Sequence, residues 1–139
     1  MHDEYAIQRT ISLYSQNASA RKWDKVVPLF QPDAVWEVPH LGMKFEGQAA
    51  IRDALTMFSG TMEFVLQLNS PALIEVTGAT ATAQSGIREC GKSAGRDEGF
   101  EFFGFYFDNL VRTQDGWKFA RRIFEGIGTN YFPLLPAKT

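Results

Sequence analysis

Alternating hydrophobic and polar positions dominate the last third of the chain, residues 100–124. Two strand-like runs flank Gln114-Asp115-Gly116, and Asp-Gly between such runs predicts a β-hairpin. Aromatic residues fall on both faces of the first run, so neither face is simply solvated. The pattern therefore predicts a hairpin in the middle of a curved sheet, which buries one face under helices and can offer the other to a partner chain.

The two faces of this first run decide which side chains line an interior. One face carries Phe103, Phe105, Phe107 and Asn109. We assign this face to the interior. Tyr106 and Asp108 then lie on the opposite face, where Asp108 is expected to pair with Arg112. Tyr106 and Asp108 face the interior only if the assignment is inverted.

Helical spacing is confined to the first sixty residues. Asp3 caps a predicted helix that runs to about residue 20 and has one buried stripe, formed by Ile7, Ile11, Tyr14 and Ala18. A short second helix follows Trp23 and has to hold Pro28 within its first turn. A third helix follows Gly47.

Strands are predicted between and after these helices. Residues 34–39 and 43–45 form two short early strands, and Ala34, Trp36 and Val38 share one face of the first. Longer strands follow over residues 61–76, with a bend near residue 70, and over residues 79–90. Residues 91–99 read as a polar, glycine-rich loop, and the apolar residues 126–139 as a docked tail. Strands grouped after helices indicate an α+β fold with helices on one face of an antiparallel sheet.

Composition fits a single domain over residues 1–139 and narrows the classes of partner. Twelve phenylalanines favour an aromatic-lined cavity or a Phe-rich core. The net charge of −2 gives no reason to expect nucleic acid or a membrane, and adjacent cations such as Arg121-Arg122 indicate a solvated edge. The single cysteine, Cys90, and the absence of a signal-peptide pattern favour a cytoplasmic location.

A set of landmarks spans nearly the whole chain: Tyr14, Trp23-Asp24, Leu29-Phe30, Asp33-Ala34, Phe45-Glu46-Gly47, Ala50-Ile51-Arg52, residues 104–112, Asp115-Gly116-Trp117 and Arg122. In this order and spacing the chain resembles a SnoaL-like protein of the nuclear transport factor 2-like superfamily. The resemblance implies a cone-shaped, cystatin-like α+β fold. In such a fold a strongly bent antiparallel sheet encloses a pocket, three N-terminal helices cover the concave face, and the sheet forms a homodimer.

The resemblance also indicates the positions at which relatives have their catalytic residues. Ketosteroid isomerase, in this superfamily, uses a first-helix tyrosine and a first-strand carboxylate; this chain keeps Tyr14 but has Val38 at the carboxylate position. The isomerase's second carboxylate corresponds to Asn109. Dehydratase-like members carry an aspartate and a histidine where Ser19 and Val65 stand here. The better-known mechanisms of the superfamily therefore do not transfer unchanged.

Few candidates for chemistry remain. His40, just past the first strand, either moves a proton at the mouth of the pocket or is a loop histidine satisfied by backbone or water. Tyr14 and Asn109 are the candidates to stabilise charge on a ligand oxygen. The expected pocket lining, which is equally compatible with plain core, consists of Trp36, Val38, Phe58, Phe103, Phe105 and Phe107. The spacing of two histidines and one cysteine predicts no metal site, and we expect no cofactor.

Two functions follow from these observations. The first is binding of a small hydrophobic molecule, without an assigned activity. The second is an isomerase, dehydratase or cyclase that acts on a polyketide-, steroid- or terpenoid-like carbonyl compound by acid–base catalysis. The missing carboxylates favour the first, and the isolated polar residues of the pocket keep the second open.

Overall fold

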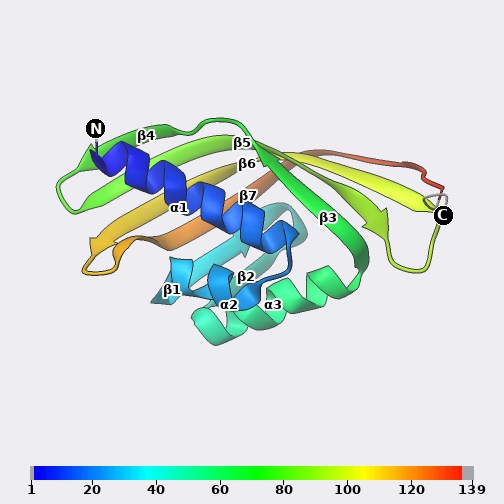
Figure 1. The fold of residues 1–139 in the computed structure, drawn as a ribbon, viewed down its shortest axis with the longest axis horizontal. Coiled ribbons are helices and arrows are strands. Elements are labelled where there is room, and N and C mark those ends of the chain that lie inside the picture. The colour runs from blue at the N-terminus through cyan, green and yellow to red at the C-terminus, as the bar shows by residue number, and fades with distance from the viewer. Residues whose placement is uncertain (1, 136–139) are drawn as a thin grey trace.

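The computed structural model describes residues 2–135 as one sheet with helices on one side (Figure 1). In chain order its elements are α1 (His2–Ser19), α2 (Trp23–Val26), η1 (Val27–Leu29), β1 (Phe30–Val38), η2 (Pro39–Leu41), β2 (Met43–Glu46), α3 (Gln48–Gly60), β3 (Met62–Asn69), β4 (Leu73–Thr77), β5 (Thr80–Ser93), β6 (Glu98–Thr113) and β7 (Gly116–Pro133). This is the α+β class predicted from the sequence.

The seven strands of the described residues form a single sheet in the order β2-β1-β7-β6-β5-β3, and β4 also pairs with β5. All pairs are antiparallel except β1 with β7, which run parallel. The predicted hairpin lies in the middle of this order as β6 and β7, and Gly116 at its turn has a φ of 100°. A residue other than glycine is strained at such a φ, which explains the Asp-Gly signal.

The helices cover one face of the sheet, which we call the inner face; the opposite face is the outer face. Figure 1 shows α1 lying across the strands, with α2 and α3 beside β1 and β2. The predicted stripe of α1 is buried, with Ile7, Ile11 and Tyr14 at 0% exposure. Pro28 lies in the first turn of η1, as its missing N–H requires.

Bulges bend the strands around the inner face. The register of β6 against β7 shifts between Phe103 and Gly104 and again between Asn109 and Leu110. Each shift adds an unpaired residue to one strand, which kinks it and increases its twist. The long central strands can therefore curve over the helices instead of forming a flat sheet.

Two segments differ from the prediction. Residues 91–93 belong to β5 rather than to a loop, because Gly91 pairs with Val65 and lets the two backbones approach closely. Residues 126–133 continue β7 and pair with β6 instead of forming a docked tail. Residues 136–139 of that tail lie outside the described residues.

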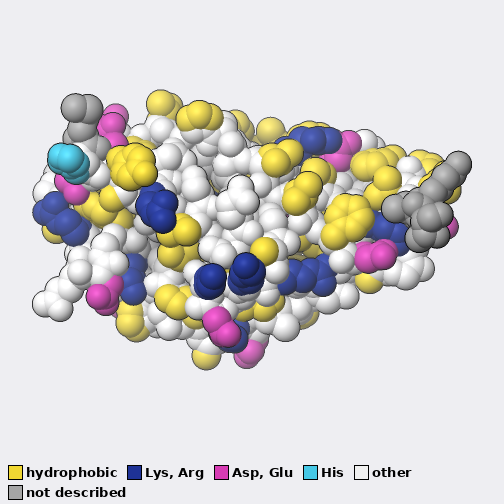
Figure 2. Space-filling view, viewed as in Figure 1, with side chains coloured by type: hydrophobic (Ala, Val, Ile, Leu, Met, Phe, Trp, Pro, Cys, Tyr) yellow, Lys and Arg dark blue, Asp and Glu magenta, His cyan; other side chains and the backbone are white. Residues whose placement is uncertain are grey.

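Large apolar side chains remain exposed on the sheet, including Phe64, Leu66 and Tyr131. Figure 2 shows hydrophobic side chains at the end of the molecule where the long strands extend past the helices. Phe105 and Phe107 are half-buried on the outer face. The homodimer expected from the resemblance would use this face, and it stays a prediction. None of the helices in residues 2–135 is long and apolar enough to cross a membrane.

Candidate functional site

A cavity of about 390 Å³ lies between the inner face and the helices. Small-molecule sites typically span about 300–1,000 Å³. Its walls are mainly apolar and come from β1, α3, β3 and β7, with Trp36, Val38, Leu55, Phe58, Val65 and Phe124 among them. Trp36, Val38 and Phe58 line the cavity, as predicted. The volume and the apolar walls suit a small hydrophobic molecule.

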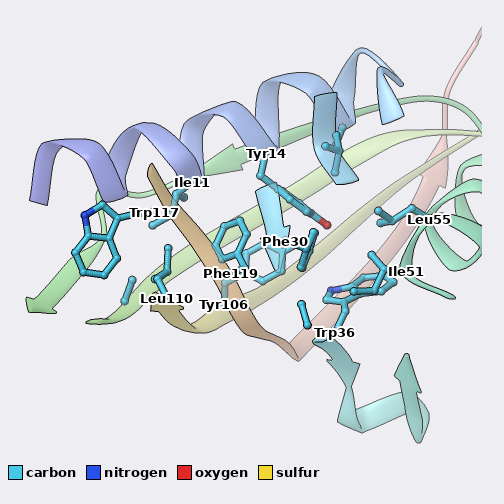
Figure 3. Packing of buried hydrophobic residues seen from close by; sticks show 14 of the residues in the cluster. Ile11, Tyr14, Phe30, Trp36, Ile51, Leu55, Tyr106, Leu110, Trp117 and Phe119 are labelled. Carbon is cyan, nitrogen blue, oxygen red and sulfur yellow. The ribbon is translucent and has the colours of Figure 1, made fainter. Parts of the chain in front are cut away.

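Two hydrogen-bond donors in this wall lack partners. Tyr14 is fully buried, and Figure 3 shows its hydroxyl pointing from α1 toward Trp36 and Leu55. Neither the Tyr14 hydroxyl nor Trp36 Nε1 meets a hydrogen-bond partner among the described residues. Burial raises the pKa of Tyr14 to about 12, although Arg122 and the nearby Tyr106 side chain oppose the shift; the Tyr106 contact does not meet the geometry of a hydrogen bond. The Tyr14 hydroxyl therefore keeps its proton at neutral pH. Both groups can therefore donate a hydrogen bond to a ligand.

A carboxyl group that sequence reasoning missed also lines the cavity. Glu89 follows Ala83, Ser85 and Ile87 on the inner face of β5, and these three residues are buried. Gln67 stands opposite Glu89 on β3, and its Nε2 donates to Glu89 Oε2 at 2.9 Å. Burial raises the pKa of Glu89 to about 7, and the Gln67 hydrogen bond opposes this. Glu89 is part-exposed, because it borders the cavity.

A fully buried carboxylate lies behind the cavity wall with a guanidinium as its neighbour. Asp108 on β6 and Arg122 on β7 are register partners, and Arg122 Nε is 3.1 Å from Asp108 Oδ1. The angles of this contact do not satisfy a hydrogen bond, so we describe it as an ion pair. The guanidinium carbon also lies 3.6 Å from the Tyr106 ring centroid and 4.2 Å from that of Tyr14. Arg122 thus fixes the two tyrosines that face the cavity.

His40 stands at the mouth of the cavity, on η2, and is exposed. Its Nδ1 accepts a hydrogen bond from the backbone N–H of Gly126 at 3.3 Å. The ring covers Gly126 so closely that a Cβ there would lie 2.7 Å from His40 Cε1. The backbone therefore satisfies His40, as one of the two expectations required, and the role of His40 in moving a proton stays a prediction.

The inner and outer faces of β6 are inverted relative to our assignment. Tyr106 and Asp108 are buried on the inner face, while Asn109 is exposed and Phe105 and Phe107 lie on the outer face. These three predicted site residues do not line the cavity. Phe103 borders it but remains 36% exposed. Both faces of β6 carry aromatic residues, so the alternation alone could not show which face is the inner one. In the structure Asp108 lies on the inner face, where it contacts Arg122 of β7.

The expected pair of Asp108 with Arg112 is also wrong. Four residues along an extended strand span about 13 Å, too far for contact between the two groups. Arg112 instead contacts Asp3 of α1, with Nη1 3.4 Å from Oδ2. Arg122 is fully buried, so the Arg121-Arg122 pair is not simply a solvated edge.

The described residues contain no group of three or more His, Cys, Asp or Glu side chains that could hold a metal ion. Cys90 is free and half-buried. Among the polar groups that line the cavity are the Tyr14 hydroxyl, Trp36 Nε1, the Gln67 amide, the Glu89 carboxyl and, at the mouth, His40.

Comparison with known proteins agrees with this architecture. A family model described as a SnoaL-like domain matches residues 1–123. An uncharacterized protein of Mycobacterium tuberculosis is 27% identical over 122 residues, which cover 87% of this chain and 83% of the relative.

Solved structures are similar over most of the chain. An NTF2-like protein with a cystatin-like fold from Novosphingobium aromaticivorans has a TM-score of 0.79 at 21% identity, covering 91% of this chain and 82% of that one. A hexachlorocyclohexane dehydrochlorinase from Novosphingobium barchaimii has a TM-score of 0.85 at 15% identity, covering 96% and 94%. A candidate scytalone dehydratase from Novosphingobium aromaticivorans has a TM-score of 0.85 at 22% identity, covering 99% and 95%. At these identities the likeness shows the fold alone.

Proposed function

This chain belongs to the SnoaL-like domain family, and we propose that it binds a small hydrophobic molecule in the cavity between its sheet and its helices. The supporting observation is an apolar cavity of about 390 Å³ whose wall holds buried polar atoms without partners. Buried polar groups in native proteins are nearly always hydrogen-bonded. The Tyr14 hydroxyl and Trp36 Nε1 would obtain partners from the polar group of a ligand.

Filling the cavity from α3 is expected to abolish this binding. Leu55 is buried and lines the cavity, so Leu55→Trp places an indole where the ligand would lie. We expect the affinity for a neutral probe, 2-naphthylmethanol, to fall at least about tenfold, which corresponds to about 1.4 kcal/mol. Isothermal titration calorimetry measures this change.

The matched control lies on the same helix. Met57 is 54% exposed and does not line the cavity, so Met57→Trp adds the same indole at the surface and is expected to leave affinity unchanged. Thermal unfolding of both variants shows whether each is folded. Equal affinity of wild type and folded Leu55→Trp, or no binding by wild type, would contradict the proposal.

A second candidate function is an acid–base isomerase, dehydratase or cyclase. One observation favours it: the cavity holds a carboxyl group, Glu89, whose pKa burial raises to about 7. A general acid or base works best when its pKa is near the working pH. In this candidate Glu89, rather than His40, carries the proton, and the Tyr14 hydroxyl donates to the oxygen of the substrate. Two similar folds belong to proteins named for elimination reactions, which agrees with such chemistry.

Proton exchange on a simple ketone tests this second function. The Glu89 carboxylate would take a proton from the carbon beside the carbonyl of 2-tetralone, the C–H electron pair would form the enolate, and in D₂O a deuteron would return to that carbon. We expect wild type to accelerate this exchange, and we expect the rate enhancement of Glu89→Gln to be at least about tenfold smaller. Proton NMR measures the exchange rate, because the signal of the exchanged C–H proton disappears.

His40→Gln is the control for this exchange, since it removes the imidazole at the mouth of the cavity and leaves Glu89 in place. It is expected to retain the acceleration. A wild type that binds 2-tetralone without accelerating exchange would rule the second function out for such ketones. The homodimer and the cytoplasmic location expected from the sequence remain separate predictions.

A further inference from the structure

Glu89 is a partly buried carboxyl group without a cation beside it. Two basic side chains of the central strands are already engaged: Arg122 on β7 pairs with Asp108, and Lys92 on β5 pairs with Glu63. Arg88, its neighbour on β5, faces the other way and binds Glu101 on the outer face. Within residues 2–135 no Lys or Arg forms an ion pair with Glu89. Charged groups in protein interiors are usually paired, so this carboxylate lacks the partner it needs.

The neighbour of Glu89 adds a second acceptor to the same corner. Gln67 uses its Nε2 to donate to Glu89, so its Oε1 is left as an acceptor, and this buried atom has no partner among the described residues. A carboxylate and an amide oxygen on adjacent strands therefore line the cavity together, and no donor among residues 2–135 reaches Gln67 Oε1. A group with several N–H bonds satisfies both acceptors together, whereas a carbonyl oxygen satisfies neither.

The rest of the wall also suits a cation. Tyr14, Trp36, Phe58 and Tyr106 all contribute to the lining. Aromatic rings attract ammonium groups electrostatically, and the attraction is larger where water is excluded. The fold already makes such contacts immediately behind the wall, where the guanidinium of Arg122 lies against Tyr14 and Tyr106.

We propose that the cavity is selective for a hydrophobic molecule that carries a protonated amine, with the ammonium group bound by the Glu89 carboxylate and Gln67 Oε1. This inference rests on the proposed binding function and names the chemical class of its ligand. The amine supplies the missing counter-charge, and the apolar part of the molecule fills the space between Trp36, Leu55 and Phe58.

The proposed pairing makes binding depend on pH. Burial raises the pKa of Glu89 to about 7, so most of the carboxyl groups are protonated at pH 6 and cannot pair with a cation. The groups that face Glu89 are Gln67 from β3, Tyr14 from α1 and Tyr106 from β6, with His40 at the mouth on η2. An ammonium group favours the ionised carboxylate, so the amine should bind more tightly as pH rises from 6 to 8.

A matched pair of probes tests the ligand class. 2-Naphthylmethylamine and 2-naphthylmethanol share one ring system, but only the amine carries a positive charge. At pH 8, calorimetry on wild type is expected to give at least about tenfold tighter binding for the amine, and a smaller preference at pH 6. In Glu89→Gln the preference should fall below about threefold while the affinity for the alcohol stays within about threefold of wild type.

One control variant separates this role from general charge effects. Glu101→Gln removes a carboxylate from the outer face, away from the cavity, and should keep the tenfold preference. If wild type binds the alcohol but the amine no more tightly, or if the preference survives in Glu89→Gln, the inference is overturned while the proposed binding function stands. If neither probe binds, the proposed function fails and the inference with it.

Discussion

Replacing Arg122 with methionine is expected to lower the free energy of unfolding by about 3–5 kcal/mol at pH 8, the largest effect of a single change in this chain. Arg122 has no exposed surface, and its guanidinium both neutralises Asp108 and lies against the rings of Tyr14, Tyr106 and Phe119. Methionine keeps much of the volume but leaves a buried carboxylate without its cation. Chemical denaturation measures the change.

The adjacent residue provides the control. Arg121 pairs with Glu37; about half of the Arg121 side chain is exposed, and the Glu37 side chain is 16% exposed. Ion pairs open to water contribute about 0–1 kcal/mol, and this pair is open on its Arg121 side, so Arg121→Met should cost clearly less than Arg122→Met. A double variant, Arg122→Met with Asp108→Leu, removes both charges together and should recover part of the loss. Equal effects of Arg121→Met and Arg122→Met would show that the buried pair does not stabilise the fold.

The loss in Arg122→Met should also depend on pH. Burial raises the pKa of Asp108 to about 6, and Arg122 opposes the shift. Without the guanidinium the pKa of Asp108 rises further, so the folded variant holds a proton above pH 6 that the unfolded chain releases. Stability falls with rising pH where the folded state binds more protons. The deficit should therefore grow from pH 6 to pH 8.

Gly91→Ala is expected to have the second large effect, about 3 kcal/mol or more of lost stability. A Cβ at Gly91 would lie 2.1 Å from the carbonyl oxygen of Phe64 and 2.9 Å from the Cα of Val65. Both atoms belong to the backbone of β3, which pairs with β5 at this point, so they cannot move away without breaking the pairing. Denaturant unfolding, or loss of soluble expression, measures the effect.

Gly86→Ala on the same strand is the matched control. A Cβ at Gly86 would lie 3.5 Å from Ser70 Oγ, which is an ordinary contact, so stability should change by less than about 1 kcal/mol. If Gly91→Ala were as stable as Gly86→Ala, the close approach of β3 to β5 at Gly91 would be incorrect.

Much of the fold could be predicted from local patterns in the sequence. The stripe of Ile7, Ile11 and Tyr14, the Pro28 position and the Asp-Gly turn each follow from the geometry of a single element. The resemblance added the bent sheet with helices on one face. The parallel pairing of β1 with β7 depends on the whole topology, and no local pattern contained it.

The site was predicted only in part, for a physical reason. Trp36 and Val38 alternate with more polar residues, so their inward direction was readable from β1. On β6 both faces are aromatic, and the direction depends on a contact between Asp108 and Arg122 that comes from another strand. Glu89 had one usable signal: it continues the small and apolar series of Ala81, Ala83, Ser85 and Ile87 on β5. A glutamate on such a face is a candidate for a buried carboxyl.

The two candidate functions place different demands on Glu89. As a counter-ion it has to stay ionised beside a bound amine, while as a proton carrier it has to change its protonation state during each turnover. Two measurements therefore separate the two roles: the preference for the amine over the alcohol, and the proton exchange on 2-tetralone. Each uses its own probe on the same Glu89→Gln variant.

A crystal structure of wild type grown with 2-naphthylmethylamine at pH 8 tests the central claim most directly. We expect the naphthyl ring inside the cavity against Trp36 and Phe58, and the nitrogen within about 3.2 Å of a Glu89 carboxylate oxygen. An empty cavity, or a ring seated inside it with its nitrogen turned to the mouth and away from Glu89, would contradict the account.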